Sequence, residues 1–176
     1  MGDFDDIQRE LREAVGGEIR AEAEENERLT ELGRRRQWDL AEVARRSMNR
    51  GDDVTVEASG RTHRGTITAV GSDYLVVETE SGVVEARLPK VIITVWRRRS
   101  GGTSLKPAAE TWRARLAELE QNGESAILLA AGKEIGGVIA VVAADHVEVT
   151  DADGTAHVFP IELTELVLRP RLPSGY

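Results

Sequence analysis

Three consecutive arginines, Arg97, Arg98 and Arg99, form the group in this sequence with the clearest chemical potential. Guanidinium groups stay charged at neutral pH and donate to phosphate oxygens in a planar fork, so such a run could neutralise a nucleic-acid backbone. Arg61 and Arg64 are expected to lie on the same domain and to extend this basic surface. The alternative is a charged linker that keeps two neighbouring domains in solution, which is a common use of short charge runs.

Two aromatic side chains could add base stacking to such a surface. Tyr74 and His146 each follow a predicted turn at equivalent places in the chain. An exposed ring can stack on an unpaired base. Packing of the same ring at the rim of a domain is the alternative.

Residues for catalysis or metal binding are scarce. The three histidines, His63, His146 and His157, have no second ligand at helical spacing, and the chain contains no cysteine. The segment 151–154 has the start of a calcium-loop pattern without its later ligands, so a hairpin turn explains it better. We therefore expect a non-enzymatic protein with no metal, no cofactor and no small-molecule substrate.

Charge and hydropathy narrow the class of partner. The net charge is −8, and most of it lies in residues 103–176, which carry 11 acidic and 6 basic residues, whereas residues 51–102 are neutral. An acidic surface repels phosphate backbones, so the second half is expected to contact protein. No apolar run approaches the roughly 18 residues of a membrane span, and the absence of cysteine fits a reducing compartment. These features predict a soluble, cytoplasmic protein that contacts no membrane.

The positions of these residues depend on an internal repeat. Residues 51–96 reappear at 123–167, first with an offset of seventy-two positions and, after Gly82, with an offset of seventy-one. Glycine adopts positive φ without steric cost, so glycines kept in register indicate the same backbone turns in both copies. The coinciding pairs include Gly51/Gly123, Gly60/Gly132, Gly65/Gly137, Gly82/Gly154 and Pro89/Pro160.

Each copy reads as a helix followed by five short strands. Alternating apolar residues predict strands in the first copy at 54–58, 62–70, 74–79, 83–88 and 92–96. Pro89 is expected to open a single 3₁₀-like turn before the fifth strand. Five short antiparallel strands with such a turn form a small, strongly bent barrel. A second helix, with apolar residues every three to four positions from Leu105 to Leu119, precedes the second copy.

The N-terminal segment is predicted to be helical over residues 3–48, with a break at Gly16-Gly17. Its apolar residues Phe4, Ile7, Leu11 and Val15 recur at helical spacing and could form a self-association arm. A solvated helical spacer, supported by pairs such as Glu24 with Arg28, is the alternative.

The whole chain is thus expected to be α+β and mainly β. A helical arm covers residues 1–36, a first helix with its barrel covers 37–100, a second helix with its barrel covers 101–170, and a flexible tail covers 171–176. Units of this size are close to the lower limit for an independent hydrophobic core, so we expect each barrel to pack against the other barrel or against a partner protein.

The predicted layout resembles the Sm-like fold, and parts of the pattern are shared with other SH3-like small barrels. The resemblance rests on two runs of the form Gly-x-x-apolar-x-Gly-x-apolar-x-x-apolar, namely Gly60-x-x-His63-x-Gly65-x-Ile67-x-x-Val70 and Gly132-x-x-Ile135-x-Gly137-x-Ile139-x-x-Val142. It implies two tandem Sm-like barrels of about 45 residues each.

The residues with which Sm proteins read RNA are largely absent from this sequence. Their positions are occupied by Gly71, Tyr74 and Leu75 in the first copy and by Ala143, His146 and Val147 in the second, and the Arg-Gly dipeptide is replaced by Leu88-Pro89 and Phe159-Pro160. Only the stacking position keeps a suitable ring. The resemblance therefore implies the fold more than the family's uridine pocket.

Two functions follow from these patterns. In the first, the chain is a non-enzymatic assembly module that self-associates or docks on a protein partner through barrel edges and through the arm of Phe4, Ile7, Leu11 and Val15. In the second, it is an RNA-binding or nucleoprotein-associated regulatory factor. Its candidate RNA contacts are Arg61, Arg64, Tyr74, Arg97, Arg98 and Arg99.

Overall fold

The computed structural model describes residues 20, 22–102 and 108–171, and the chain divides into two compact units after Asp39. In the first unit residues 22–35 are helical, and Arg35 pairs with Glu31 at 3.1 Å. The helix predicted over 3–48 is interrupted at 36–39, before a second helix begins. The proposed arm residues Phe4, Ile7, Leu11 and Val15, and most of the predicted tail, lie outside the described residues.

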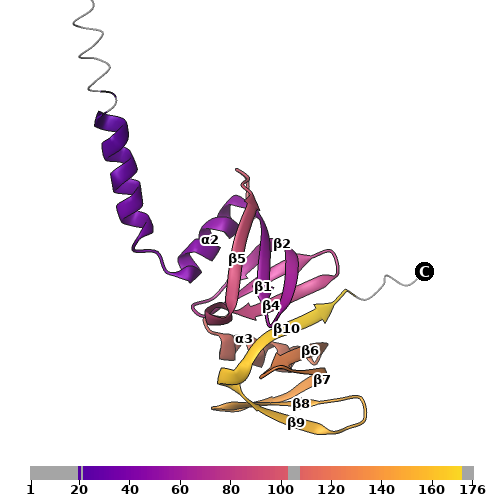
Figure 1. Cartoon of the computed structure of the whole chain (residues 1–176). Helices are drawn as coiled ribbons and strands as arrows, with labels where there is room; N and C mark the ends of the chain where they lie inside the picture. The colour runs from indigo at the N-terminus through magenta and orange to yellow at the C-terminus, as the bar shows by residue number, and fades with distance from the viewer. Residues whose placement is uncertain (1–19, 21, 103–107, 172–176) are drawn as a thin grey trace, which may run out of the picture. The chain divides into compact units, whose positions relative to one another are not determined.

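The second unit contains both repeats, and each is a helix followed by five strands (Figure 1). The first repeat consists of α2 (Leu40–Arg50), β1 (Asp53–Ala58), β2 (Arg61–Val70), β3 (Tyr74–Thr79), β4 (Gly82–Arg87), η1 (Leu88–Lys90) and β5 (Val91–Arg97). The second consists of α3 (Trp112–Asn122), β6 (Ser125–Ala130), β7 (Lys133–Val142), β8 (His146–Thr150), β9 (Ala156–Pro160), η2 (Ile161–Leu163) and β10 (Thr164–Pro170). The predicted strands and the 3₁₀ turn at Pro89 are confirmed.

All ten strands belong to one antiparallel sheet, in the order β5-β1-β2-β3-β4-β10-β6-β7-β8-β9. The order within each repeat is the same, with the fifth strand beside the first and the fourth strand at the opposite side. The structure thus confirms a mainly β, α+β fold with an internal repeat. The repeats are joined where β4 pairs with β10, so the sheet continues from one repeat into the other (Figure 1). The two separate barrels expected from the sequence are not confirmed.

The offset of seventy-one predicted after Gly82 is wrong. The Leu88 amide donates to the Asp73 carbonyl, and the Ile161 amide donates to the Asp145 carbonyl, each at 2.8 Å. Leu88 therefore corresponds to Ile161, seventy-three positions away. Four residues separate the paired Glu78 and Val83, whereas five separate the equivalent pair Thr150 and Ala156. The second repeat thus has one extra residue in this turn, and the alignment of Pro89 with Pro160 is a coincidence of composition.

A β-bulge at Glu165 shifts the correspondence by one further residue. Thr164 pairs with Ala130, but Leu166 pairs with the adjacent Leu129. Beyond the bulge, Val167 pairs with Leu128 as Ile93 pairs with Val56 in the first repeat. The C-terminal part of β10 therefore corresponds to β5 with an offset of seventy-four. A bulge of this kind turns the following side chains to the opposite face.

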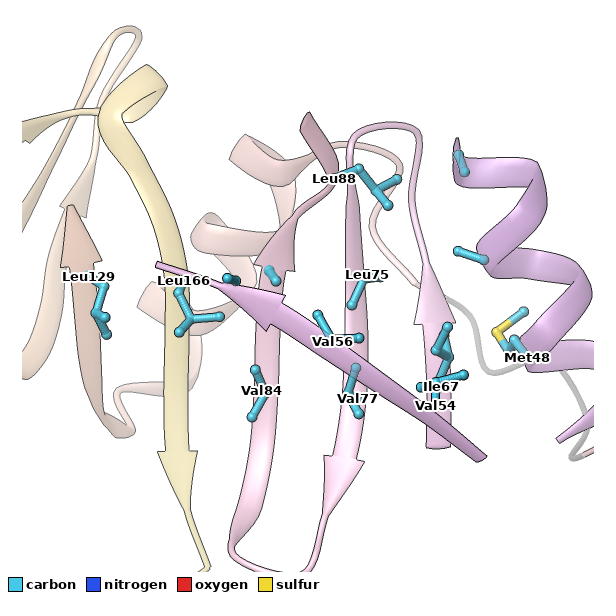
Figure 2. Close-up of a cluster of buried hydrophobic side chains, with 14 residues drawn as sticks. Met48, Val54, Val56, Ile67, Leu75, Val77, Val84, Leu88, Leu129 and Leu166 are labelled. Carbon is cyan, nitrogen blue, oxygen red and sulfur yellow. The ribbon is translucent and has the colours of Figure 1, made fainter. Parts of the chain in front are cut away.

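Two hydrophobic clusters lie on opposite faces of the sheet, because successive strand residues point in opposite directions. On β3, Leu75 and Val77 belong to the cluster under α2, whereas Tyr74 and Val76 belong to the cluster under α3. Figure 2 shows the first cluster, into which Leu166 projects from β10 of the other repeat. Each core thus contains side chains of both repeats, as expected for units too small to bury enough surface alone.

Candidate interaction surfaces at the joint and at the ends of the sheet

The arginine run that follows β5 is only partly free to contact a ligand. The Arg99 guanidinium donates to Asp53 Oδ2 at 2.7 Å, and the Arg99 amide donates to Asp52 Oδ1 at 2.9 Å. Arg97 and Arg98 are exposed. The fold itself therefore neutralises the charge of Arg99.

The structure brings part of the predicted basic surface together in one groove beside β2. Arg64, Arg97 and Arg99 line it with the exposed ring of Trp96. Acidic residues line the same groove, namely Asp53, Glu78 and Glu80. Arg61 lies elsewhere on β2 and forms an ion pair with Glu134 of β7. The groove is thus of mixed charge.

Tyr74 is placed where a base cannot reach it. The side chain is fully buried, its hydroxyl donates to the Ala109 carbonyl at 2.8 Å, and its ring centroid lies 6.0 Å from that of Trp112. Burial raises the pKa of the phenol to about 12. Tyr74 thus serves the packing of α3 against the first repeat, and both faces of its ring are covered.

The joint between the repeats contains a buried ionic cluster that sequence patterns did not indicate. Glu85 on β4 is fully buried. Its carboxylate accepts from Arg115 Nε at 2.7 Å and Nη2 at 2.8 Å, and from Arg169 Nε at 2.9 Å. Glu85 raises the pKa of the Arg115 guanidinium. One carboxylate thus holds together β4 of the first repeat and both α3 and β10 of the second.

The start of α3 is fixed to the same joint. Asp73, in the turn between β2 and β3, accepts from the Trp112 amide at 2.6 Å. Trp112 Nε1 donates to Thr164 Oγ1 at 2.7 Å. Because the first N–H groups of a helix have no intrahelical partner, Asp73 both caps α3 and attaches it to the other repeat.

The two ends of the sheet carry exposed apolar side chains. Within the described chain, β5 and β9 each have a strand neighbour on one side only. On β5 the exposed fractions are 62% for Ile92 and 59% for Trp96, and Leu40 at the start of α2 is 39% exposed. Near β9 they are 40% for Val141 and 58% for Val158. Clustered exposed apolar residues along an unpaired strand edge are typical of a contact surface.

The apolar surface at the β9 end corresponds to the surface at which the repeats meet. Val141, Glu148 and Val158 lie opposite one another across β7, β8 and β9. The corresponding row in the first repeat is Ala69, Val76 and Glu85, and it continues to Val167 of the neighbouring β10. The row of the second repeat stops at Val158, where no further strand follows in the sheet.

A scan against protein-family models and a search of the curated proteins found no match to this chain. No helix in the described part is both long and apolar enough to cross a bilayer. Within the same residues, no cluster of three or more His, Asp or Glu side chains is arranged to hold a metal ion.

Proposed function

We propose that this chain is a non-catalytic assembly module that self-associates head to tail, with β9 of one copy adding to β5 of the next. The observation that carries the proposal is the β4–β10 pairing. In it, the fourth strand of one repeat pairs with the fifth strand of the other. β9 is the fourth strand of its repeat and β5 is the fifth strand of its own, and both have a free edge.

Repeat equivalence predicts the register of the intermolecular pair. Glu85 pairs with Val167, and these correspond to Val158 and Ile93. Val158 of one copy should therefore lie opposite Ile93 of the next, in antiparallel orientation. Such an added strand satisfies a row of backbone N–H and C=O groups that the free edges leave to solvent.

Apolar burial supplies the driving force for this contact. At the joint, Leu166 pairs with Ala86 and is buried in the core of the first repeat. Its counterpart Ile92 is 62% exposed in the single chain. In the proposed contact Ile92 would lie opposite Phe159 of the second copy. Full burial of one such side chain is worth about 1.5–3 kcal/mol. Several of them together can offset the entropy lost on association, which is estimated at about 4–15 kcal/mol.

The β9 end also contains a concavity in the position that corresponds to the Trp112 contact. It is lined by Asp145, His146 and Val158, among others, and these correspond to Asp73, Tyr74 and Glu85. Leu40, the first residue of α2, corresponds to Trp112, the first residue of α3. Leu40 of a second copy is thus expected to occupy this concavity.

The Sm-like resemblance gains support from the repeated layout. Each repeat is a helix followed by five antiparallel strands, with a 3₁₀ turn before the fifth. The contact we propose joins different surfaces of two copies. It therefore forms either a closed ring or an open filament, depending on the rotation between copies.

Sedimentation velocity over a range of concentrations tests the assembly. The wild-type chain should form oligomers below about 0.1 mM, which corresponds to an association free energy near −5.5 kcal/mol. Ile92→Lys should shift the chain towards monomer, because it places a charge in the apolar contact. Leu29→Lys is the matched control, since Leu29 is 55% exposed and belongs to the N-terminal unit, whose described residues contribute no strand to the sheet. A wild-type chain that stays monomeric would remove the proposal.

Deletion of residues 1–33 separates this route from association through the N-terminal arm. An assembly made by β5 and β9 survives the deletion, because both strands and α2 lie in the unit that begins at Leu40. Loss of oligomers on deletion would instead support the arm of Phe4, Ile7, Leu11 and Val15.

RNA binding in the groove beside β2 is the second candidate function. The groove brings Arg64, Arg97 and Arg99 next to the exposed Trp96 ring, an arrangement suited to phosphate and base contacts. Filter binding of labelled RNA at low and moderate salt tests it. Binding that weakens with salt and is lost when Arg97, Arg98 and Arg99 are all changed to alanine supports it. No retention even at low salt excludes it.

A further inference from the structure

We propose that three corresponding positions decide which strand ends may pair, so that β4 accepts only β10 and β9 accepts only β5 of another copy. At the joint these positions are Glu85, Arg115 and Arg169. At the free ends they are all valine, namely Val158, Val43 and Val95. The proposal rests on the head-to-tail assembly described above and adds the basis of its selectivity.

The correspondence follows from the fold. Val158 pairs with Glu148 as Glu85 pairs with Val76. Val43 and Arg115 are each the fourth residue of an eleven-residue helix. Because α2 and α3 end at Gly51 and Gly123 in the same left-handed conformation, the two helices are in register.

The third position lies beyond the bulge of β10. The offset of seventy-four, fixed by the pairs Val167–Leu128 and Ile93–Val56, makes Val95 the counterpart of Arg169. Arg169 donates to Glu85 from β10, and Val95 occupies the same place on β5. Each of the three charged residues at the β4–β10 joint thus corresponds to a valine at the free ends of the sheet.

The β4–β10 joint and the proposed β9–β5 contact cannot exchange strands without leaving a charge unpaired. In the joint, Glu85 is fully buried and depends on both guanidinium groups for its hydrogen bonds. If β4 paired instead with β5 of another copy, Val43 and Val95 would face Glu85, and a buried carboxylate would lose its partners. If β10 paired with β9, Arg115 and Arg169 would face Val158. Both exchanges leave a buried charge uncompensated, which is strongly unfavourable.

The consequence is an ordered assembly. Two repeats with the same strand order could exchange strands between chains and produce mixed pairings. The ionic cluster restricts β10 to pairing with a β4 strand and excludes β9, and the valines leave β9 and β5 for contact between chains. A rejected pairing is as important to specificity as a favoured one.

A charge-exchange experiment tests the selectivity. Val158→Glu alone and Val43→Arg alone should each weaken self-association roughly a hundredfold, because each places one unpaired charge in an apolar contact. The double variant V43R/V158E recreates the Glu85–Arg115 pair between chains. It should recover most of the lost association and should be weakened by salt, unlike the wild type.

The matched control is V43R/V141E. Val141 is exposed at the same end of the sheet, but its counterpart in the first repeat is Ala69, which is not part of the ionic cluster. A glutamate there should not rescue Val43→Arg. Val158→Gln serves as the uncharged variant and should weaken association less than Val158→Glu, with no rescue by Val43→Arg. Thermal unfolding of each variant monitors the fold.

The outcomes separate this inference from the proposed function. A monomeric wild type overturns the assembly itself. A wild type that assembles, with V43R/V158E no better associated than the single variants or no better than V43R/V141E, overturns the selectivity and leaves the assembly standing. Recovery that is specific to V43R/V158E supports both.

Discussion

Glu85 and Arg115 are 30 residues apart in the sequence, yet two hydrogen bonds of 2.7 and 2.8 Å join them across the boundary between the repeats. Arg169 donates to the same carboxylate, so the contact joins three segments and shows that the repeats form one structure. The free ends of the sheet have valines at the positions that correspond to Glu85, Arg115 and Arg169.

Replacement of Glu85 tests how much the joint depends on this carboxylate. Glu85→Ala leaves two largely buried guanidinium groups without their shared partner, so we expect it to lower the free energy of unfolding by about 3–5 kcal/mol. Urea denaturation measures the change. Glu124→Ala is the control, because Glu124 contacts Arg169 from a side chain that is 54% exposed, and exposed pairs contribute about 0–1 kcal/mol. A Glu85→Ala effect no larger than that of the control would contradict the role given to the cluster.

Titration of Tyr74 tests its burial. The chain has two tyrosines, Tyr74 and Tyr176, so a Tyr176→Phe variant reports on Tyr74 alone. Absorbance at the phenolate band should change near pH 12, because burial raises the pKa of Tyr74 to about 12, compared with about 10 in unfolded chains. The raised pKa means that the folded state holds the proton more tightly. Stability from this group is therefore complete below about pH 10 and is lost as the pH rises towards 12. A midpoint near pH 10 in the folded protein would show an accessible ring.

Gly71 tests the close packing beside Tyr74. A Cβ at Gly71 would lie 2.2 Å from Cε1 of the Tyr74 ring and 2.8 Å from the Glu110 carbonyl oxygen. Gly71→Ala should therefore destabilise the protein by about 1–3 kcal/mol, as expected for overpacking. Gly136→Ala is the control, since no atom lies within 4 Å of its Cβ position. Equal melting temperatures for the two variants would contradict the packing described.

The second repeat has Ala143 where the first has Gly71, and the difference has a physical reason. His146, the counterpart of Tyr74, is only half-buried, and no α3-like segment of the described chain covers it. A glycine is therefore needed at position 71, where the other repeat packs the Tyr74 ring against the turn, and is not needed at position 143.

The secondary structure could be predicted from sequence because it depends on local patterns. Alternation located the strands, and repeated glycines at turns such as Gly60 and Gly132 located the duplication, since both have positive φ. The offset after Gly82 was wrong because a chance alignment of Pro89 with Pro160 hid an insertion in the preceding turn. Local alignment carries no information on strand pairing, and the pairing fixed the offset.

The joint could not be predicted because it depends on contacts between distant segments. Glu85 stands in a short alternating strand, where a carboxylate usually marks the solvent face. Its partners Arg115 and Arg169 are on α3 and β10, and no pattern near Glu85 in the sequence indicates them. Tyr74 was interpreted as a stacking candidate for the same reason. A ring at the start of a strand gives no sign of the helix that covers it.

Disulfide trapping tests the central claim most directly, because the chain contains no cysteine of its own. The β4–β10 register places Leu168 opposite Val84, and the corresponding residues are Thr94 and His157. Directly opposite residues have Cβ atoms about 5 Å apart, which is close enough for a disulfide after small adjustment. The variant T94C/H157C should therefore form covalent multimers on mild oxidation in non-reducing electrophoresis. T94C/T155C, shifted by two residues, should stay monomeric. Monomer only in the first variant, or equal cross-linking in both, would contradict head-to-tail pairing of β9 with β5.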